Sequence, residues 1–254
     1  MLSRTGVALV ATLIAAAAPA SAADLPPRQA PAAPLLAPQP VGGLYFMSRT
    51  GIGSVDDTSF ALGGGSVGVR NEYEAGTTSF VALGYSFGPV LGGLTPRVEV
   101  EGMYGTFSID THTVNGTQVP SIDSFGDLRS LGAFGSAYLD FNLGTLFGSG
   151  LSAITPFVGG GIGFAQVELR KQGISATGVV IDDEDAQVAY HLSAGVGISL
   201  SGLGFGNALF DRTTLELGYR HLQVQDLEFT ARDGTTSETD VTKNLFTVGV
   251  RRQF

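Results

Sequence analysis

The sequence predicts an all-β fold, a closed antiparallel β-barrel of eight strands that spans a membrane. Three observations predict this fold class. Apolar and polar residues alternate in eight segments, the connectors between the segments are alternately short and long, and no segment beyond the first 22 residues is apolar enough for a membrane-spanning helix. The segment 242–254 shows the pattern clearly, with Phe246, Val248 and Val250 on one face and an aromatic residue, Phe254, at its end.

The amino-acid composition fits a protein whose outer surface faces lipid. Hydrophobic residues make up 43% of the chain and charged residues only 15%, whereas a soluble domain carries about 25% charged residues. Backbone groups in hydrocarbon must pair with one another, which leaves helices or a closed barrel. The formal charge of −9 argues against nucleic-acid binding, and the lack of cysteine excludes disulfides and thiolate metal sites.

The amino terminus reads as a secretion signal. Residues 1–22 combine Arg4, an apolar run from Val7 to Ala18 and a small-residue cleavage site, with cleavage expected after Ala22 or Ala23. Residues 23–40 are rich in proline and alanine and predict an extended leader without a packed core. The barrel domain is therefore predicted to occupy residues 41–254.

Strand predictions follow from the alternation and its interruptions. The predicted strands are 42–53, 75–88, 95–109, 127–143, 154–170, 186–201, 212–227 and 242–254. The short connectors are 89–94, 144–153 and 202–211, and the long polar connectors are 54–74, 110–126, 171–185 and 228–241. Short periplasmic turns opposite long external loops are typical of outer-membrane barrels. A host or phage ligand is expected to dock on the loops, at residues such as Phe60, His112 and Asp233.

Charged residues on the predicted strands indicate a polar interior. Arg97, Glu99 and Glu101 share one face, opposite Val98 and Val100. A basic residue facing hydrocarbon near the midplane costs about 2–4 kcal/mol, so the charged face is expected to point inward. The same argument places further residues in a paired interior network. Its predicted members are Arg97, Glu99, Glu101, Asp140, His191, Glu216, Arg220 and Arg251, with Tyr138 beside them.

The interior of an eight-stranded barrel is only wide enough for side chains to fill it. A structural role of the network is therefore predicted. The alternative is a narrow, gated pore that opens when the ion pairs rearrange. On the outer face, aromatic residues are candidates for girdles at the membrane interfaces: Phe46, Tyr85, Phe87, Tyr104, Phe141, Phe164 and Tyr219.

The order of several short motifs resembles the opacity-protein group of small outer-membrane barrels in alphaproteobacteria. The motifs are Ala22–Pro26, Ala82–Gly88, Arg97–Glu99, Thr155–Gly163 and Leu217–Arg220. The resemblance implies an OmpA-type barrel without a peptidoglycan-binding domain, located in the outer membrane after secretion. It also implies contact with lipid and lipopolysaccharide, and assembly by the barrel-assembly machinery with Phe254 as the assembly signal. This chain has Arg252 where the group usually has an aromatic residue.

Two further sites have a pattern that suggests chemistry. His191 and Ser193 lie two residues apart on one strand face, and Glu216 could complete a triad of the kind found in an outer-membrane lipid A deacylase. The predicted inward orientation of the pair argues against contact with lipid. The acidic run Asp182–Asp185 could bind Ca²⁺, although a solvated loop is favoured because the run lacks the spacing of a calcium loop.

The sequence as a whole predicts a monomeric outer-membrane barrel with a structural or surface-interaction role. A narrow porin is the second hypothesis and the deacylase the third. No enzymatic activity, metal or cofactor is expected.

Overall fold

The computed structural model describes residues 42–203 and 210–254. The predicted signal peptide (1–22), the leader (23–40) and part of the 202–211 connector lie outside the described residues, and so does the whole Ala22–Pro26 motif. Within the described residues, no helix is both long and apolar enough to cross a membrane.

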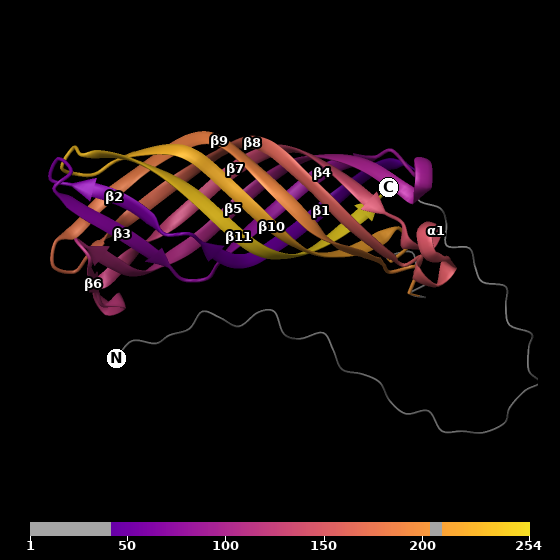
Figure 1. The fold of residues 1–254 in the computed structure, drawn as a ribbon, viewed down its shortest axis with the longest axis horizontal. Helices are drawn as coiled ribbons and strands as arrows, with labels where there is room; N and C mark the ends of the chain where they lie inside the picture. The colour runs from indigo at the N-terminus through magenta and orange to yellow at the C-terminus, as the bar shows by residue number, and fades with distance from the viewer. Residues whose placement is uncertain (1–41, 204–209) are drawn as a thin grey trace, which may run out of the picture. The chain divides into compact units, whose positions relative to one another are not determined.

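Eight long antiparallel strands close into a ring, which confirms the predicted fold class (Figure 1). Their order around the ring is the order in the chain, and the last strand pairs with the first. The ring strands are β1 Gly43–Val55, β4 Gly76–Ser86, β5 Leu94–Val114, β7 Ser124–Phe141, β8 Ile154–Ile174, β9 Gly178–Ser199, β10 Thr213–Thr230 and β11 Thr236–Gln253.

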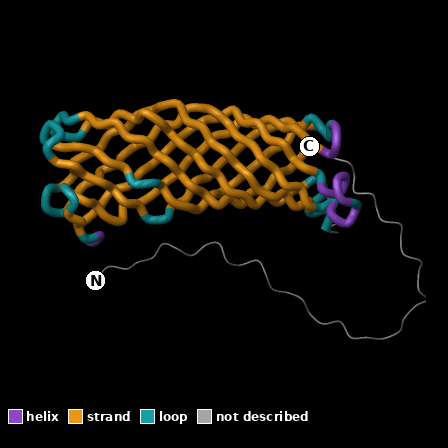
Figure 2. Tube along the Cα trace, viewed as in Figure 1, coloured by secondary structure: helices purple, strands orange, loops and turns teal. Residues whose placement is uncertain are grey.

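Short elements lie at the two ends of the barrel (Figure 2). At one end, called the hairpin end, the strands β2 (Thr58–Leu62), β3 (Val67–Tyr73) and β6 (Thr117–Val119) extend the sheet, followed by the 3-10 turn η2 (Ser121–Asp123). At the other end, called the turn end, the strands are joined through η1 (Leu91–Gly93), α1 (Leu143–Phe147) and η3 (Ser149–Leu151).

The long connectors were predicted as polar loops, and this prediction is wrong for most of their residues. Strands β8 and β9 are separated only by residues 175–177, and β10 and β11 only by residues 231–235. The segments 54–74 and 110–126 contain β2, β3 and β6. The physical reason is that buried apolar residues such as Leu169, Ile181 and Phe229 continue the alternation, so strand pairing extends beyond the apolar outer surface.

An apolar band surrounds the outer face of the ring on the side of the turn end. Its side chains are 40% to 74% exposed and come from all eight ring strands. The band consists of Leu44, Phe46, Ile52, Val81, Leu83, Tyr85, Val98, Val100, Tyr104, Leu131, Val158, Ile162, Phe164, Val188, Leu192, Leu217, Tyr219, Phe246, Val248 and Val250. A continuous exposed apolar surface of this kind indicates contact with a membrane or a partner.

Candidate functional site: the barrel interior and the hairpin end

A cluster of charged side chains fills the barrel inside the apolar band. It arises because outward apolar residues alternate with inward charged ones, as where Val98 and Val100 flank Glu99 on β5. We call it the interior charge network; its members are Arg49, Arg97, Arg220, Arg251, Glu99, Glu101, Asp140 and Glu216.

One half of the network is centred on Arg97. Its Nε donates to Asp140 Oδ1 at 2.9 Å, and its Nη1 donates to Glu99. The second oxygen of Asp140 accepts from Arg251 Nη1 at 2.9 Å. The hydroxyl of Tyr45 donates to Glu99 Oε1 at 2.9 Å. Arginine and carboxylate groups from three strands, with the Tyr45 hydroxyl from a fourth, are thereby held in one hydrogen-bonded array.

The other half is centred on two glutamates. Arg49 Nη1 donates to Glu101 Oε2 at 3.0 Å, and Arg49 Nη2 donates to Glu216 Oε2 at 3.2 Å. Both terminal nitrogens of Arg220 donate to Glu101, one of them at 3.1 Å. Arg251 Nε lies 3.2 Å from Glu216 Oε1 and joins the two halves.

Opposite charges in this network balance. In the part of the chain that the structure describes, it contains four guanidinium groups and four carboxylates, so its formal charge is zero. The side chains are almost fully buried, with Arg251 the most exposed at 14%. Removal of one partner from a buried ion pair costs about 3–5 kcal/mol because a charge is left unpaired. The stability of the folded state therefore depends on keeping these charges paired.

Two glycines provide the space that the large interior side chains need. Gly84 on β4 pairs with Tyr45 on β1, and a Cβ atom at Gly84 would overlap the Tyr45 ring. Gly159 on β8 pairs with Tyr138 on β7, with the same consequence. The missing side chains let both rings lie flat against the wall, and the phenol groups of Tyr45 and Tyr138 reach Glu99 and Arg220.

Two interior basic residues were missed by the sequence analysis. Arg49 follows Tyr45 and Met47 on the odd-numbered face of β1, opposite Phe46, and this alternation could have identified it. Lys243 lies between polar outward neighbours and gave no such signal.

Lys243 crosses the interior from β11 to β7, which is on the opposite side of the ring. It is fully buried, its Nζ donates to Ser130 Oγ and lies 5.2 Å from the centre of the Phe107 ring. Among the described residues, no carboxylate lies within 4.0 Å of it.

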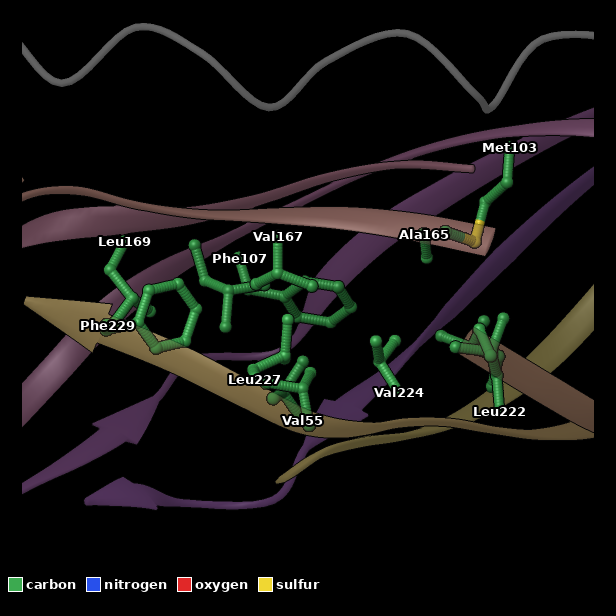
Figure 3. Close-up of a cluster of buried hydrophobic side chains, with 14 of the residues drawn as sticks. Val55, Met103, Phe107, Ala165, Val167, Leu169, Leu222, Val224, Leu227 and Phe229 are labelled. Atoms are coloured by element: carbon green, nitrogen blue, oxygen red, sulfur yellow. The ribbon is translucent and has the colours of Figure 1, made fainter. Parts of the chain in front are cut away.

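An apolar plug fills the interior between the charge network and the hairpin end. Figure 3 shows part of this cluster in close-up. Every ring strand contributes to it, and β2 and β3 add one residue each. The plug consists of Val55, Phe60, Val69, Phe80, Met103, Phe107, Leu128, Phe134, Ala165, Val167, Leu169, Ile181, Ala189, Leu222, Val224, Leu227, Phe229, Val241 and Leu245. Apolar side chains from all ring strands pack across the bore in this layer, and the buried Lys243 and Ser130 lie among them.

The triad that the sequence left open as an alternative does not assemble. His191 and Ser193 point into the barrel, where Ser193 Oγ lies 3.3 Å from His191 Nδ1 and accepts a hydrogen bond from Arg220 Nε at 3.0 Å. The other ring nitrogen of His191 bonds to Ser136 Oγ at 2.9 Å. Glu216 bonds to arginines instead of the imidazole. His191 therefore has two serine partners and no orienting carboxylate.

Two of the three residues expected to dock a ligand are buried. Phe60 and His112 are 5% and 1% exposed, since both lie on inward faces of the sheet extension. Burial lowers the pKa of His112 below its ordinary value. Asp233 is exposed, and its carboxylate accepts from the backbone N–H groups of Gly63 and Thr235, which hold its pKa below the ordinary range.

These contacts tie the β2–β3 hairpin to the β10–β11 turn. Besides the Asp233 contact, Gly64 N donates to Thr235 Oγ1 at 2.9 Å and Ala61 N donates to Ser237 Oγ at 2.9 Å. Hydrogen bonds between side chains and backbone thus hold the hairpin end together where the strands no longer pair through backbone hydrogen bonds.

The acidic run is part of β9, and the prediction of a loop is wrong here. Asp183 and Asp185 face the gap where β9 and β10 diverge, and they accept from the backbone N–H groups of Thr230 at 2.7 Å and Glu228 at 2.9 Å. The run thereby replaces missing ladder bonds. No cluster of three or more metal-binding side chains occurs within residues 42–203 and 210–254.

Six of the seven predicted girdle residues are 40% to 68% exposed on the outer face, and Phe141 is half-buried. Phe254 is 69% exposed, and its backbone N–H donates to Leu44 O at 3.0 Å, which closes the seam between β11 and β1. Its role as an assembly signal stays a prediction.

The barrel is similar to solved outer-membrane proteins. Neisserial surface protein A has 18% identity and a TM-score of 0.44, over 84% of this chain and 97% of that one. The attachment invasion locus protein Ail of Yersinia pestis has 11% identity and a TM-score of 0.36, over 82% and 98%. The outer-membrane protein AlkL has 16% identity and a TM-score of 0.39, over 89% and 96%.

No family model matches the sequence. No curated protein matches it either. The strand pairing of this chain itself closes the eight-stranded ring.

Proposed function

We propose that this chain is an integral outer-membrane protein that carries a rigid interaction surface on a barrel with a closed interior. The observation that carries the proposal is the division of the barrel into three parts. Lipid would contact the apolar band, the neutral charge network and the apolar plug close the bore, and the cross-linked hairpin end lies beyond the band.

The wall beyond the band supports an orientation with the hairpin end outside the cell. Charged residues replace apolar ones on the outer faces of β8 to β11 there, among them Glu184, Glu228, Glu238 and Asp240. Outer-membrane barrels have short periplasmic turns and long external extensions. A partner that recognises the hairpin end would meet a predominantly acidic surface, so a basic partner surface fits best.

Epitope insertion tests the orientation. A tag inserted after Gly234, in the β10–β11 turn, should be accessible to antibody on intact cells. A matched tag inserted after Gly148, between α1 and η3, should become accessible only after the outer membrane is permeabilised. Both glycines have positive φ and open space around them, so insertion there disturbs little packing. Equal accessibility of the two tags on intact cells would contradict the proposal.

A narrow channel is the second candidate function, because the bore is lined by an interior charge network whose ion pairs would rearrange to open it. The plug argues against it, since ions would have to cross an apolar layer. Refolded protein in planar lipid bilayers should show no stepwise conductance. Conductance steps that change on substitution of Glu99→Gln or Arg220→Gln would establish the channel instead.

A further inference from the structure

The buried charges of the described residues do not balance. Besides the interior charge network, which is neutral, they include the ammonium of Lys243, while the buried His112 and His191 count as neutral. The interior therefore has a formal charge of +1. A buried ammonium must either lose its proton or gain a counter-charge, because an isolated charge in apolar surroundings is costly. The groups around the Lys243 nitrogen favour a counter-charge.

Two buried hydroxyl groups lie on the wall that Lys243 reaches. Thr78 on β4, Gly105 on β5 and Ser130 on β7 are directly opposite one another on neighbouring strands. Gly105 places no side chain between the hydroxyls, since a Cβ there would lie 2.7 Å from Thr78 Oγ1 and 2.9 Å from Ser130 Oγ. The inner wall is therefore open between the two hydroxyl groups, and the Lys243 nitrogen contacts it at Ser130.

Hydrogen-bond donors exceed acceptors at this place. An ammonium has three N–H donors and each hydroxyl has one O–H donor. Lys243 Nζ uses one donor on Ser130 Oγ and faces the Phe107 ring at 5.2 Å from the ring centre. Thr78 Oγ1 is buried and has no hydrogen-bond partner among the described residues, and Ser130 Oγ donates to none of them. Two N–H and two O–H groups are thus left without an acceptor.

We propose that Lys243, Thr78 and Ser130 bind one halide ion, chloride under ordinary conditions, inside the apolar plug. A halide only accepts hydrogen bonds, so it satisfies the ammonium and both hydroxyls and makes the interior neutral. A water molecule would add two donors to a place that already has too many, and would leave the positive charge uncompensated. A doubly charged oxyanion would exceed the single positive charge of the site.

The bound ion completes the plug and is not a step in a conduction path. Toward the hairpin end the bore is filled by apolar side chains, among them Leu169, Ile181 and Phe229. Toward the turn end lies the charge network, where arginines and carboxylates are paired with one another. Planar bilayers bathed in chloride should therefore show no stepwise conductance. Chloride-selective steps that disappear in Lys243→Met would overturn the assignment of a fixed ion.

The dependence of stability on chloride tests the proposal. The refolded full-length protein in lipid vesicles is unfolded with urea in sodium gluconate or sodium chloride at constant ionic strength, and circular dichroism follows the transition. From chloride-free buffer to about 100 mM chloride, the unfolding equilibrium constant of the wild-type protein should fall about tenfold, which corresponds to a dissociation constant of about 10 mM. Bromide should replace chloride. The absence of a chloride effect would overturn the proposal.

Three variants assign the effect to the site. Lys243→Met should abolish the response to chloride, and Thr78→Val, which removes one donor and keeps nearly the same shape, should reduce it to about threefold or less. Thr95→Val is the matched control, because Thr95 is a buried, inward threonine at the turn end of β5, and it should keep the tenfold response. Each protein is compared with itself, so a change in its absolute stability does not enter. An equal response of the wild-type protein and Lys243→Met would overturn the proposal.

Bromide locates the ion directly. In crystals of the wild-type protein grown in sodium bromide, anomalous diffraction should show one bromide within hydrogen-bonding distance of Lys243 Nζ and Thr78 Oγ1. The same peak should be absent from crystals of Thr78→Val or much weaker there. A barrel interior without a bromide peak at Lys243 would refute the site, whatever the response of stability to salt.

Discussion

Neutralising Glu101 should destabilise the barrel more than any surface substitution. Glu101 accepts from Arg49 Nη1 at 3.0 Å and from both terminal nitrogens of Arg220. In Glu101→Gln the amide oxygen can keep one of these partners, while the amide N–H₂ group faces the other arginine. The loss is one to two charge-assisted hydrogen bonds at about 1.5–3 kcal/mol each. The network charge also changes from zero to +1. We therefore expect the free energy of unfolding to fall by about 3–5 kcal/mol.

A double-mutant cycle separates charge balance from packing. Glu101→Gln combined with Arg220→Gln returns the network to three arginines and three carboxylates. It should recover about 1–2 kcal/mol relative to the sum of the single variants. Urea unfolding of the refolded protein in lipid vesicles, followed by circular dichroism and gel mobility, measures these values. Glu238→Gln, which is exposed, should change stability by about 0.5 kcal/mol or less. A Glu101→Gln variant as stable as this control would refute the reasoning.

Three more predictions follow from the geometry. Lys243→Met replaces a buried ammonium, which has no carboxylate partner among the described residues, with a side chain suited to the apolar plug. The free energy of unfolding in urea should stay unchanged or rise by about 1–2 kcal/mol. A clear fall in the free energy of unfolding would show that the ammonium stabilises the fold. Gly84→Ala should push the Tyr45 ring from the wall and lower the free energy of unfolding by about 1–3 kcal/mol. Gly135→Ala is the control on the outer face, where the nearest atom is 4.0 Å from the added Cβ, and should leave this free energy unchanged. Equal destabilisation by the two variants would contradict the packing argument. The third concerns pH. Because the Gly63 N–H lowers the pKa of Asp233, the tether should be intact above the ordinary value of 3.8 and be lost only as pH falls through a lower value; an NMR titration of the Gly63 amide with a midpoint at or above 3.8 would contradict this.

The sequence predicts the barrel because its strands obey one simple rule within the apolar band. A charged residue cannot face lipid, so the orientation of Glu99 or Glu216 follows from the residues beside it. The strand count and the ring order follow from eight such segments joined by turns.

Other features depend on contacts between segments far apart in the chain. Beyond the band both faces of a strand meet polar or buried surroundings, so the polarity of Asp183 or Glu184 does not distinguish strand from loop. Phe60 and His112 look like exposed loop residues until the β2–β3 hairpin folds them inward. The position of Lys243 across the ring from Ser130 depends on which strands face each other, which no local pattern encodes.

The central claim is that the apolar band faces lipid while the hairpin end lies outside it. The chain contains no tryptophan, so one introduced tryptophan reports on a single position. Val248 and Glu238 both face outward on β11, the first within the band and the second beyond it. In vesicles whose lipids carry bromine on the acyl chains, Val248→Trp fluorescence should be strongly quenched and Glu238→Trp fluorescence should not. Equal quenching of the two tryptophans by the brominated acyl chains would contradict the account.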